Sequence, residues 1–512
     1  IVSCAASSLR PIPPSSRLDI ASPYTPLRAA RSNAPPRAEP IDPPAPMTLT
    51  AENCDAPVKT SNDNAQVCST LEPAATEPTP KEKPKTPTAA LNVRQAAMAG
   101  RNVASFHQGR LGTDSFTFAR LRAQPRYRHA VRILLVTWEF PPETVGGVGA
   151  HVDGLSKSLA KDGHEVCIFT LAAHGVTSDQ VVAAVRIIRA NVDLPWLPDD
   201  NAVSFVASGN HHLTALFAHL GSWRPDVVHA HDWRSAWAGQ SLATMCAVPL
   251  VTTFHATESG RHGGNVPEGN SASIHSVESW IANTSQRVIC CSRFMQREVI
   301  DGFELIPDQV QLIPNGVDVD VWSPSGEQDR SMLVLAWGRV QYEKGFQVLA
   351  QAIGRLRGRV PGIHCIIAGR GPYLPELQSQ VDIEGVSDLV QLAGYVADDE
   401  LRTLLHQAGC VVIPSLYEPF GIVALESLAA NAPTIVARTG GLAEIMEGTE
   451  TSLMFEPGNA KELATRIERV LMNPSVSNKM QQQGSEVLHS RFSWDAIARS
   501  TIGAYDIART GL

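Results

Sequence analysis

The amino-acid sequence predicts an α/β protein with two doubly wound, Rossmann-like domains that face a central cleft. Short apolar runs alternate with amphipathic stretches from residue 131 onward, and the series starts again near residue 332. A polar link at residues 320–330 separates the two series. Strands that alternate with helices form parallel sheets, which bind ligands at the carboxyl ends of their strands. The cleft between two such sheets is therefore the expected site.

The composition is that of an ordinary globular protein and excludes several classes. The chain has 512 residues, too many for one hydrophobic core, with 43% hydrophobic and 18% charged residues. Its net charge of −8 argues against nucleic acid or anionic membranes as partners. Nine cysteines without C-x-x-C spacing favour a reducing compartment. No apolar run reaches the ~20 residues of a membrane span, so we expect a cytoplasmic protein without stable membrane insertion.

Residues 1–128 differ from the rest of the chain and are expected to form a disordered tail. They are rich in Pro, Ala, Ser and Thr and contain few periodic apolar residues, so they cannot bury enough surface to offset the entropy of ordering. The opening is rich in Ser and Arg and poor in acids, as in a transit peptide, which leaves a plastid location as an alternative. The chain starts at Ile1, and Met47 is a plausible true start.

The first domain is expected over residues 129–320. Residues 131–137 are apolar except for Arg132 and Thr137, which is typical of a strand buried on both faces. Residues 151–162 have helical spacing, and Gly163 suits the end of that helix. The further expected strands of this domain are 165–171, 227–231, 250–255, 288–291 and 310–313.

The second domain is expected over residues 331–490 and repeats the pattern. Its expected strands are 333–340, 364–368, 389–392, 410–414 and 434–437. Its expected helices are 347–356, 399–407, 420–430 and 460–472. We expect a C-terminal helix over residues 491–512, with a return to the N-terminal domain as one option.

A glycine-containing loop, residues 138–149, links the first strand to the first helix. Gly146 and Gly147 would let backbone N–H groups approach a phosphate at the helix N-terminus, where the helix dipole favours anions. A nicotinamide coenzyme would require G-x-G-x-x-G, but Val152 stands at the third glycine position. A nicotinamide oxidoreductase is therefore disfavoured, and a purely structural turn stays open.

The block of residues 418–426, Glu-Pro-Phe-Gly-Ile-Val-Ala-Leu-Glu, follows an apolar strand. Pro419 suits the start of a helix, and the unpaired N–H groups after it can hold phosphate or sugar oxygens. Glu426 lies about two turns into that helix and could accept hydrogen bonds from a ribose diol. Glu418 and Glu426 could alternatively belong to a solvated helix face.

Arg339 and Lys344 follow the first strand of the second domain. A planar guanidinium and a point-charge ammonium five residues apart suit a diphosphate, although exposed Arg/Lys pairs are also common.

Two histidine-containing segments end strands of the first domain. In residues 229–233, His-Ala-His-Asp-Trp, a neutral histidine could bind a sugar hydroxyl or simply pack in the core. His255, Glu258 and Arg261, followed by flexible glycines, suit a polar loop that binds an acceptor. A metal site is the alternative for this loop, but H-E-x-x-H is absent and no third ligand is evident.

The Asp318–Asp320 pair matches the short D-x-D metal pattern. This pattern is common by chance, and here it lies at the edge of the link between domains. We therefore expect neither a metal site nor a cofactor.

In combination these motifs resemble the retaining glycosyltransferases of family 4, which have the GT-B fold. The resemblance covers about residues 131–512 and rests on residues 418–426 together with Gly338-Arg339 and Lys344. Residues 229–233, 255–261 and 417–420 look most similar to the glycogen-synthase-like α-1,4-glucosyltransferases of actinobacteria. The resemblance implies transfer of a hexose, most simply glucose, from a nucleotide sugar such as UDP- or ADP-glucose to an α-glucan or similar glycan.

The resemblance also implies a role for each matching residue. His231, Arg339, Lys344 and Glu418 would act in catalysis, with Arg339 and Lys344 at the diphosphate, Glu418 at the sugar hydroxyls and His231 at the primary hydroxyl. Glu426 would bind the ribose. The remaining donor-binding positions would be Gly146, Gly147, Tyr395, Val396, Phe420, Gly421, Ile422 and Val423. Front-side attack would retain the anomeric configuration, with the leaving phosphate assisting deprotonation of the acceptor.

One position departs from the bacterial glycogen-synthase pattern, in which a lysine precedes the paired glycines as K-x-G-G. Thr144 stands there in this chain, so the donor base and the acceptor stay open. The alternatives are a sucrose-phosphate-synthase-like enzyme, an enzyme with a lipid-linked acceptor, and a non-catalytic glycan-binding protein. The last of these would not need Arg339, Lys344 and Glu426 together.

Overall fold

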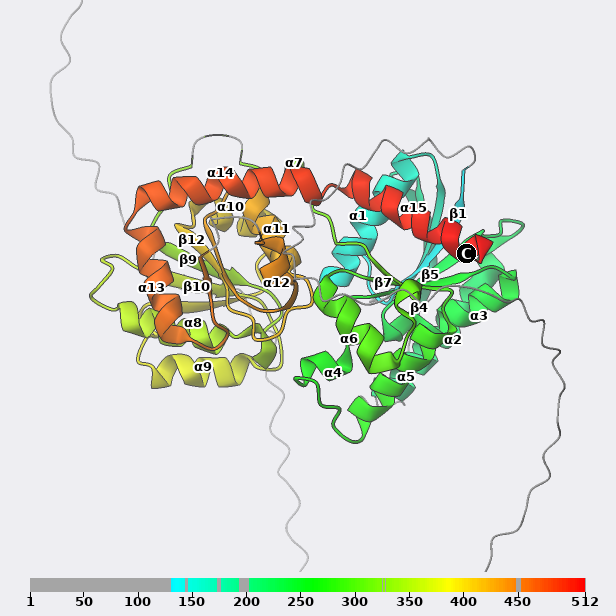
Figure 1. The fold of residues 1–512 in the computed structure, drawn as a ribbon, viewed down its shortest axis with the longest axis horizontal. Helices are drawn as coiled ribbons and strands as arrows, with labels where there is room; N and C mark the ends of the chain where they lie inside the picture. Colours follow the sequence, from blue (N-terminus) through cyan, green and yellow to red (C-terminus); the bar gives the residue numbers. More distant parts are fainter. Residues whose placement is uncertain are drawn as a thin grey trace, which may run out of the picture. The chain divides into compact units, whose positions relative to one another are not determined.

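The computed structural model describes residues 130–142, 146–172, 176–192, 202–324, 326, 328–447 and 453–511. The expected tail over residues 1–128, with Met47, lies outside these ranges, and so does Thr144. Within them, strands and helices alternate along the chain in two successive series (Figure 1). Among the described helices, none is both long and apolar enough to cross a membrane.

The first series builds an eight-stranded sheet in the order β3-β4-β2-β1-β5-β6-β7-β8. Neighbouring strands are parallel except for the antiparallel pair β3 and β4. In the register, Leu134 of β1 lies beside Cys167 of β2 and Val228 of β5. The strands are β1 (Arg132–Val136), β2 (Glu165–Ala172), β3 (Ser178–Val182), β4 (Val185–Asn191), β5 (Val227–His231), β6 (Leu250–Phe254), β7 (Arg287–Cys290) and β8 (Val310–Leu312).

The second series builds a six-stranded sheet in the order β11-β10-β9-β12-β13-β14, in which all neighbours are parallel. The strand order reverses direction at β9, which is where ligands of doubly wound sheets bind. The strands are β9 (Leu333–Trp337), β10 (His364–Ala368), β11 (Val390–Gly394), β12 (Cys410–Ile413), β13 (Thr434–Ala437) and β14 (Leu453–Phe455).

Fifteen α-helices connect these strands within the described ranges. In the first series they are α1 (Gly147–Lys161), α2 (Ala202–Ala215), α3 (Ala236–Cys246), α4 (Glu258–Arg261), α5 (Asn270–Thr284), α6 (Arg293–Phe303) and α7 (Val319–Trp322). In the second they are α8 (Phe346–Leu356), α9 (Leu374–Ile383), α10 (Asp398–Gln407), α11 (Ile422–Ala429), α12 (Gly440–Ile445), α13 (Ala460–Leu471), α14 (Pro474–Arg491) and α15 (Trp494–Thr510).

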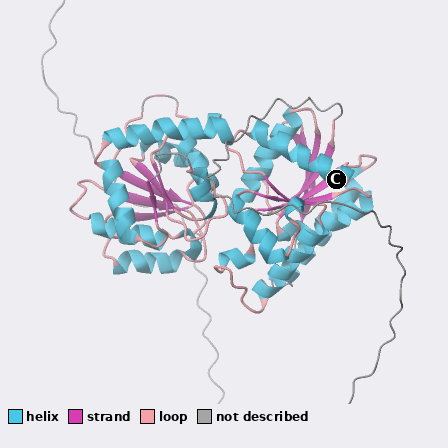
Figure 2. Cartoon of the chain, viewed as in Figure 1, coloured by secondary structure: helices cyan, strands magenta, loops and turns pink. Residues whose placement is uncertain are grey.

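Helices cover both faces of each sheet (Figure 2). Alternate residues of a strand point to opposite faces, so Leu134 of β1 packs in one core cluster while Ile133 packs in another. In the second sheet, Leu335 and Val334 of β9 divide in the same way. Strands buried on both faces are typical of parallel sheets, and the predicted fold class of two Rossmann-like domains is confirmed.

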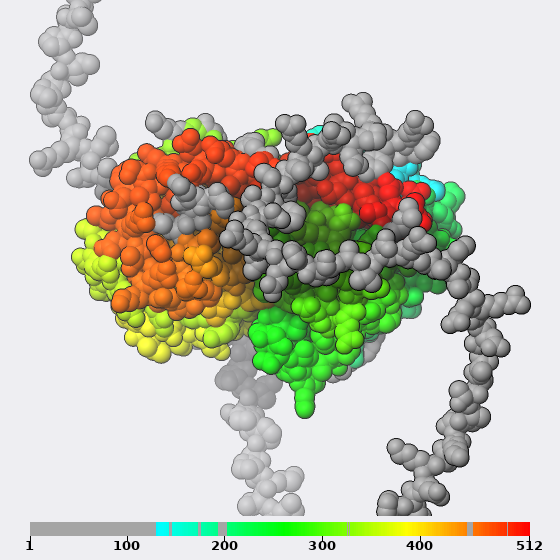
Figure 3. Space-filling view, viewed as in Figure 1, coloured from blue at the N-terminus to red at the C-terminus, as the bar shows by residue number. Residues whose placement is uncertain are grey.

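The C-terminal helix α15 packs against α1 of the first series. Gly154 of α1 permits this approach, because a Cβ at that position would lie 2.2 Å from the Trp494 ring. Farther along α15, the buried hydroxyl of Tyr505 lies 2.8 Å from His229 Nδ1. In the space-filling view, α14 and α15 contribute orange and red atoms to the surface (Figure 3).

The structure differs from the expected elements mainly at their ends. The strand expected over 333–340 ends at Trp337, because the chain turns at Gly338, whose φ is +142°. The first helix begins at Gly147, four residues before the expected 151–162. Strands β3, β4 and β14 were not expected. For β3 the reason is that the mostly exposed run Ser178–Val182 lacks the pattern of a buried strand.

Candidate active site

The segment from Ser415 to Val423 lies at the carboxyl end of β12 and turns sharply into α11. Gly421 has φ of +104°, and a Cβ there would lie 2.4 Å from Leu442 Cδ2, so glycine is required. No side chain caps the N-terminus of α11. The amides of Ile422 and Val423 therefore offer donors at the positive end of the helix dipole.

Lys344 and Glu418 form an ion pair in this segment. Lys344 Nζ lies 2.8 Å from Glu418 Oε2, and Ser415 Oγ donates to the same oxygen at 3.0 Å. Both partners are largely buried. Because these two contacts share Oε2, Glu418 Oε1 is left for another donor, such as a sugar hydroxyl.

Three arginines lie near one another without a carboxylate partner among the described residues. Arg339 follows β9, while Arg261 ends α4 and Arg234 lies in the turn after β5. Burial lowers the pKa of Arg339, and the positive charges of Arg261 and Arg234 lower it further, although Glu343 acts in the opposite direction. Its Nε is buried and has no hydrogen-bond partner. Such a concentration of positive charge can bind a polyanion.

Glu426 lies on α11, the helix whose first amides are uncapped. Burial raises the pKa of its carboxyl to about 7, and a hydrogen bond from the side chain of Trp337 opposes that shift. Trp337 is the last residue of β9, so the carboxyl lies beside the point where the strand order reverses. A carboxyl with this pKa can accept hydrogen bonds from a diol once it is ionised.

Tyr395 and Arg370 form an exposed platform at the ends of β11 and β10. The Tyr395 side chain is 63% exposed, and the Arg370 guanidinium lies 5.3 Å from the centre of its ring. Val396 is partly buried and packs against the core. A planar group stacked on another with one face open suits a nucleotide base.

The glycine loop meets the start of α11 directly. A Cβ on Gly147 would lie 3.0 Å from Ile422 Cδ1, so the two helix N-termini are close. Gly146 is the N-cap residue of α1 and provides no side-chain cap. Glu139 Oε1 accepts a hydrogen bond from the Gly149 amide at 3.3 Å, so a carboxylate already binds part of this helix N-terminus.

The two histidines at the end of β5 have different environments. His229 is buried and fully bonded, with Tyr505 on Nδ1 and Thr253 Oγ1 at 2.7 Å on Nε2, so it is a structural core residue. His231 Nδ1 lies 3.2 Å from His255 Nε2, while His231 Nε2 is buried without a partner. An unpaired buried nitrogen at the end of a strand is available to a ligand hydroxyl.

The three residues expected to bind an acceptor are not equally available. His255 is partly exposed, and its backbone amide is held by Asp232 Oδ1 at 2.7 Å. Glu258 is held by Ser271 Oγ at 2.7 Å and by His262 Nε2 at 3.2 Å. Arg261 belongs to the group of unpaired arginines, so its surroundings suit an anion better than a neutral hydroxyl.

Several hydrogen bonds join the segment around Glu418 to the first series of elements. Ser292 Oγ donates to the Pro419 carbonyl at 2.6 Å, and the Tyr417 hydroxyl donates to Glu298 Oε1 at 3.1 Å. Glu444 accepts from the amides of Arg293 and Phe294 at the start of α6. These bonds place the site at residues contributed by both sheets.

Asp318 of the Asp318–Asp320 pair has a structural function. Asp318 Oδ1 accepts hydrogen bonds from the amides of Asp320 and Val321 and thereby caps α7. This is the ordinary role of an aspartate at a helix start.

Sequence reasoning missed Arg234, Arg370 and His151 as residues of the site. Arg234 directly follows the 229–233 motif and could have been found by counting cations after strand ends. Arg370 stands in a Gly-Arg-Gly turn after β10. His151 occupies an ordinary inward position of the amphipathic helix α1, and nothing in its local sequence marks it.

The fold and these residues define a glycosyltransferase of the GT-B class: two Rossmann-like sheets, uncapped helix starts and unpaired cations. Comparisons with known proteins agree. Residues 145–321 match the family model of "Glycosyltransferase Family 4", and residues 322–487 match that of "Glycosyl transferases group 1".

The chain is 36% identical over 396 residues to a glycogen synthase of Mycobacterium tuberculosis, covering 74% of this chain and 96% of that protein. It therefore belongs to glycosyltransferase family 4.

Solved structures show the same fold at lower identity. A sucrose-phosphate synthase from Thermosynechococcus elongatus matches with a TM-score of 0.63 at 23% identity, over 74% of this chain and all of that one. The catalytic domain of starch synthase IV from Arabidopsis thaliana, bound to ADP and acarbose, matches with a TM-score of 0.59 at 17% identity. That match covers 75% of this chain and all of the other.

Proposed function

We propose that this glycosyltransferase transfers glucose from UDP- or ADP-glucose to an α-glucan with retention of the anomeric configuration. One observation carries the proposal: Arg234, Arg261 and Arg339 lie near one another, and none of them forms a salt bridge within the described part of the chain, although carboxylates such as Glu343 and Asp232 lie in the vicinity. A nucleoside diphosphate supplies the matching negative charge. The partners are thus a nucleotide sugar and a glycan.

The nucleoside end of the donor would bind to the second sheet. The base would stack on Tyr395 beside Arg370, next to Val396, and the ribose diol would donate to Glu426. The diphosphate would lie between Arg339 and Lys344, with backbone amides of Gly146, Gly147, Phe420, Gly421, Ile422 and Val423 around the phosphates and the sugar.

The transfer step needs stabilisation of the leaving group above all. The bond between the anomeric carbon and the phosphate oxygen breaks, and the acceptor oxygen bonds to that carbon from the same face. The acceptor proton passes to the leaving phosphate. Arg339 and Lys344 stabilise the negative charge that develops, so no metal or cofactor is required.

The sugar itself would be held by His231 and Glu418. His231 Nε2 is the unpaired nitrogen offered to the primary hydroxyl, and Glu418 Oε1 is the oxygen left by Lys344 and Ser415. His255 would lie toward the acceptor, Glu258 would support that loop through Ser271, and Arg261 would face the donor phosphates rather than the neutral acceptor.

The acceptor follows from similarity to the glycogen synthase and is consistent with acarbose in the starch synthase structure. The free cysteines described here suit a reducing compartment, so we place the enzyme in the cytoplasm, with a plastid as the alternative.

The test is release of nucleoside diphosphate from UDP-, ADP- and GDP-glucose, each with maltooligosaccharides, fructose 6-phosphate or no acceptor. We expect rapid release only with a UDP or ADP donor and maltooligosaccharide, and the same rate in EDTA. Release that needs fructose 6-phosphate would replace the glucan by a sugar phosphate. No acceptor-dependent release from any donor would contradict the proposal.

A further inference from the structure

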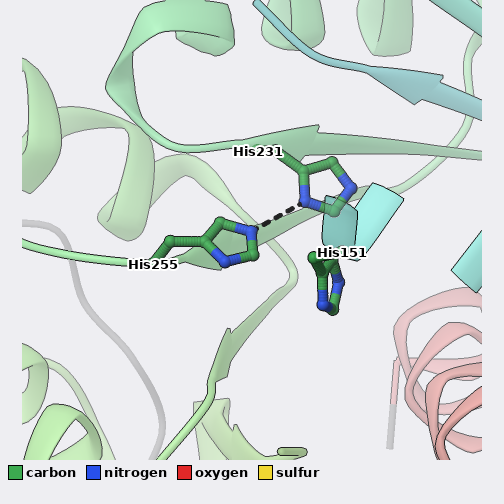
Figure 4. A group of neighbouring side chains, drawn as sticks. All are labelled: His151, His231 and His255. Atoms are coloured by element: carbon green, nitrogen blue, oxygen red, sulfur yellow. Dashed lines mark hydrogen bonds between the residues drawn. The ribbon is translucent and has the colours of Figure 1, made fainter. Parts of the chain in front are cut away.

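Three histidines from separate elements meet in the first series of elements. His151 comes from α1, His231 ends β5, and His255 follows β6. One ring nitrogen of each can be chosen so that all three lie within 4.8 Å of one another. Figure 4 shows His231 and His255 facing each other across a hydrogen bond, with the His151 ring beside them. We call His151, His231 and His255 the three-histidine cluster.

Several ring nitrogens of this cluster lack a hydrogen bond of normal geometry within the protein. Nε2 of His231 is buried without a hydrogen-bond partner, and neither ring nitrogen of His151 makes a hydrogen bond of normal geometry, although the Asn315 side chain lies beside that ring. His151 is only 4% exposed and His231 only 1%. Buried polar atoms almost always have partners, so unpaired nitrogens on two neighbouring rings point to a missing ligand.

The surroundings keep the rings in the form that binds metal. The rings of His151 and His231 are buried and that of His255 is partly buried, and burial favours the neutral imidazole. Neutral imidazole is the form that coordinates late first-row divalent cations. The Trp494 ring lies 5.5 Å from His151 and shields this side of the cluster.

The distances allow one ion to bind all three rings. A tetrahedral ion with Zn–N bonds of about 2.0–2.1 Å spaces its ligand nitrogens about 3.3 Å apart. His231 Nδ1 and His255 Nε2 already lie 3.2 Å apart. Small side-chain rotations of His151 would bring its nitrogen to the same spacing, because its ring lies only 4.7 Å from that of His255, centre to centre.

We propose that the three-histidine cluster is a binding site for a late first-row divalent cation, Zn²⁺ above all, with the fourth coordination position open. Three nitrogen ligands without a carboxylate favour zinc over magnesium or calcium, which require oxygen ligands. The ion is not needed for the transfer reaction.

The proposed site has a consequence for the enzyme that rests on the proposed function. His231 is the residue assigned to the primary hydroxyl of the donor sugar. A metal on Nδ1, the His231 nitrogen that faces His255, leaves the ring proton on Nε2. Nε2 can then donate to the hydroxyl but can no longer accept from it, so a bound metal weakens the binding of the donor sugar. We therefore expect zinc to inhibit transfer and to leave the binding of nucleoside diphosphate, which lacks the sugar, unchanged.

Binding is tested on the whole chain after removal of metal with EDTA and dialysis. Titration with Zn²⁺ by calorimetry and with Co²⁺ by visible absorption should show one site per chain, with the intense bands of tetrahedral Co²⁺. His151→Asn should weaken both at least tenfold. His211→Asn, which removes an exposed histidine of α2 outside the cluster, is the matched control and should bind as the parent does.

The melting temperature of metal-free His151→Asn shows whether that variant is folded. The Co²⁺ spectrum of the parent protein tests the site without using any variant. A parent without tetrahedral Co²⁺ bands, or equal binding by the parent and a folded His151→Asn, would overturn the site. A loss of binding in His211→Asn alone would also overturn it.

Inhibition is tested separately, so that the two proposals fail in different ways. Zn²⁺ should raise the donor KM of the parent in an EDTA-reversible manner, and His151→Asn should resist it at least tenfold better. Stoichiometric zinc binding without inhibition would overturn the proposed effect of the metal on donor-sugar binding. Zinc binding by a protein that transfers no sugar from any donor would sustain the metal site and reject the proposed function.

Discussion

Replacing Arg339 by Ala tests the leaving-group argument most sharply, because the structure predicts opposite effects on turnover and on stability. Arg339 forms no ion pair among the described residues, and Arg261 and Arg234 repel its charge. Removing it should therefore leave the melting temperature unchanged or slightly higher. The transition state, in contrast, should lose one preorganised cation, a loss of ~3–4 kcal/mol or about 10²–10³ in kcat.

The matched control is Arg330→Ala, which removes an arginine whose side chain, unlike that of Arg339, forms several hydrogen bonds within the described part of the chain. The Arg330 guanidinium donates to four backbone carbonyls, those of Leu405, Ala408, Ala430 and Asn431. Its loss leaves those carbonyls unpaired and should lower the melting temperature by several degrees, while the folded fraction keeps its turnover. Both variants are measured by steady-state release of nucleoside diphosphate and by thermal unfolding. An Arg339→Ala protein that turns over within a few-fold of the parent, or that melts like Arg330→Ala, would refute the reasoning.

Three further predictions concern the ribose, the sugar and the core. The pKa of Glu426 is about 7 in the free protein, and ribose binding favours its ionised form. The affinity for nucleoside diphosphate should therefore rise about tenfold from pH 6 to pH 8 and level off above pH 8. Glu426→Gln should remove this rise. If calorimetry finds the same pH dependence of affinity in the parent and in Glu426→Gln, the ribose assignment is contradicted. His231→Ala should lower kcat with little change in affinity for nucleoside diphosphate, and a loss of nucleotide binding would show that the residue does not act on the sugar. Tyr505→Phe leaves His229 Nδ1 without a partner and should destabilise the fold by ~1–3 kcal/mol. The control Tyr342→Phe, at an exposed ring, should not change the melting temperature. Equal melting temperatures of the two variants would count against the structural role of His229.

Most strands of both sheets could be predicted because continuous apolar runs identify strands covered on two faces, although the buried strand β4 and the short strand β14 were not expected. The strand expected over residues 227–231 has the observed bounds, Val227–His231. The antiparallel pair β3 and β4 escaped prediction because β3 carries Ser178, Asp179 and Gln180 and is largely exposed. β3 forms by pairing with β4, and no local sequence pattern predicts that pairing.

The site, like the fold, has a part that the sequence predicts and a part that only the structure shows. The short motifs marked Lys344 and Glu418, which the structure brings to 2.8 Å of each other across 74 residues of chain. No motif could show that Arg234 and Arg261 lie near Arg339, because their proximity arises from three different loops. Likewise, His151 becomes notable only when α1 is packed on its sheet and its ring meets His231 and His255.

The central claim is retaining transfer of glucose to an α-glucan, and proton NMR of the product tests it most directly. The enzyme is incubated with maltoheptaose and the nucleotide sugar that supports turnover, and the anomeric signals are followed from the first turnovers onward. We predict growth of the α-1,4 signal, with no new β-glycosidic signal beyond that of the reducing end, and with one nucleoside diphosphate released per bond formed. A β-linked product, or nucleoside diphosphate released with only free glucose formed, would contradict the account.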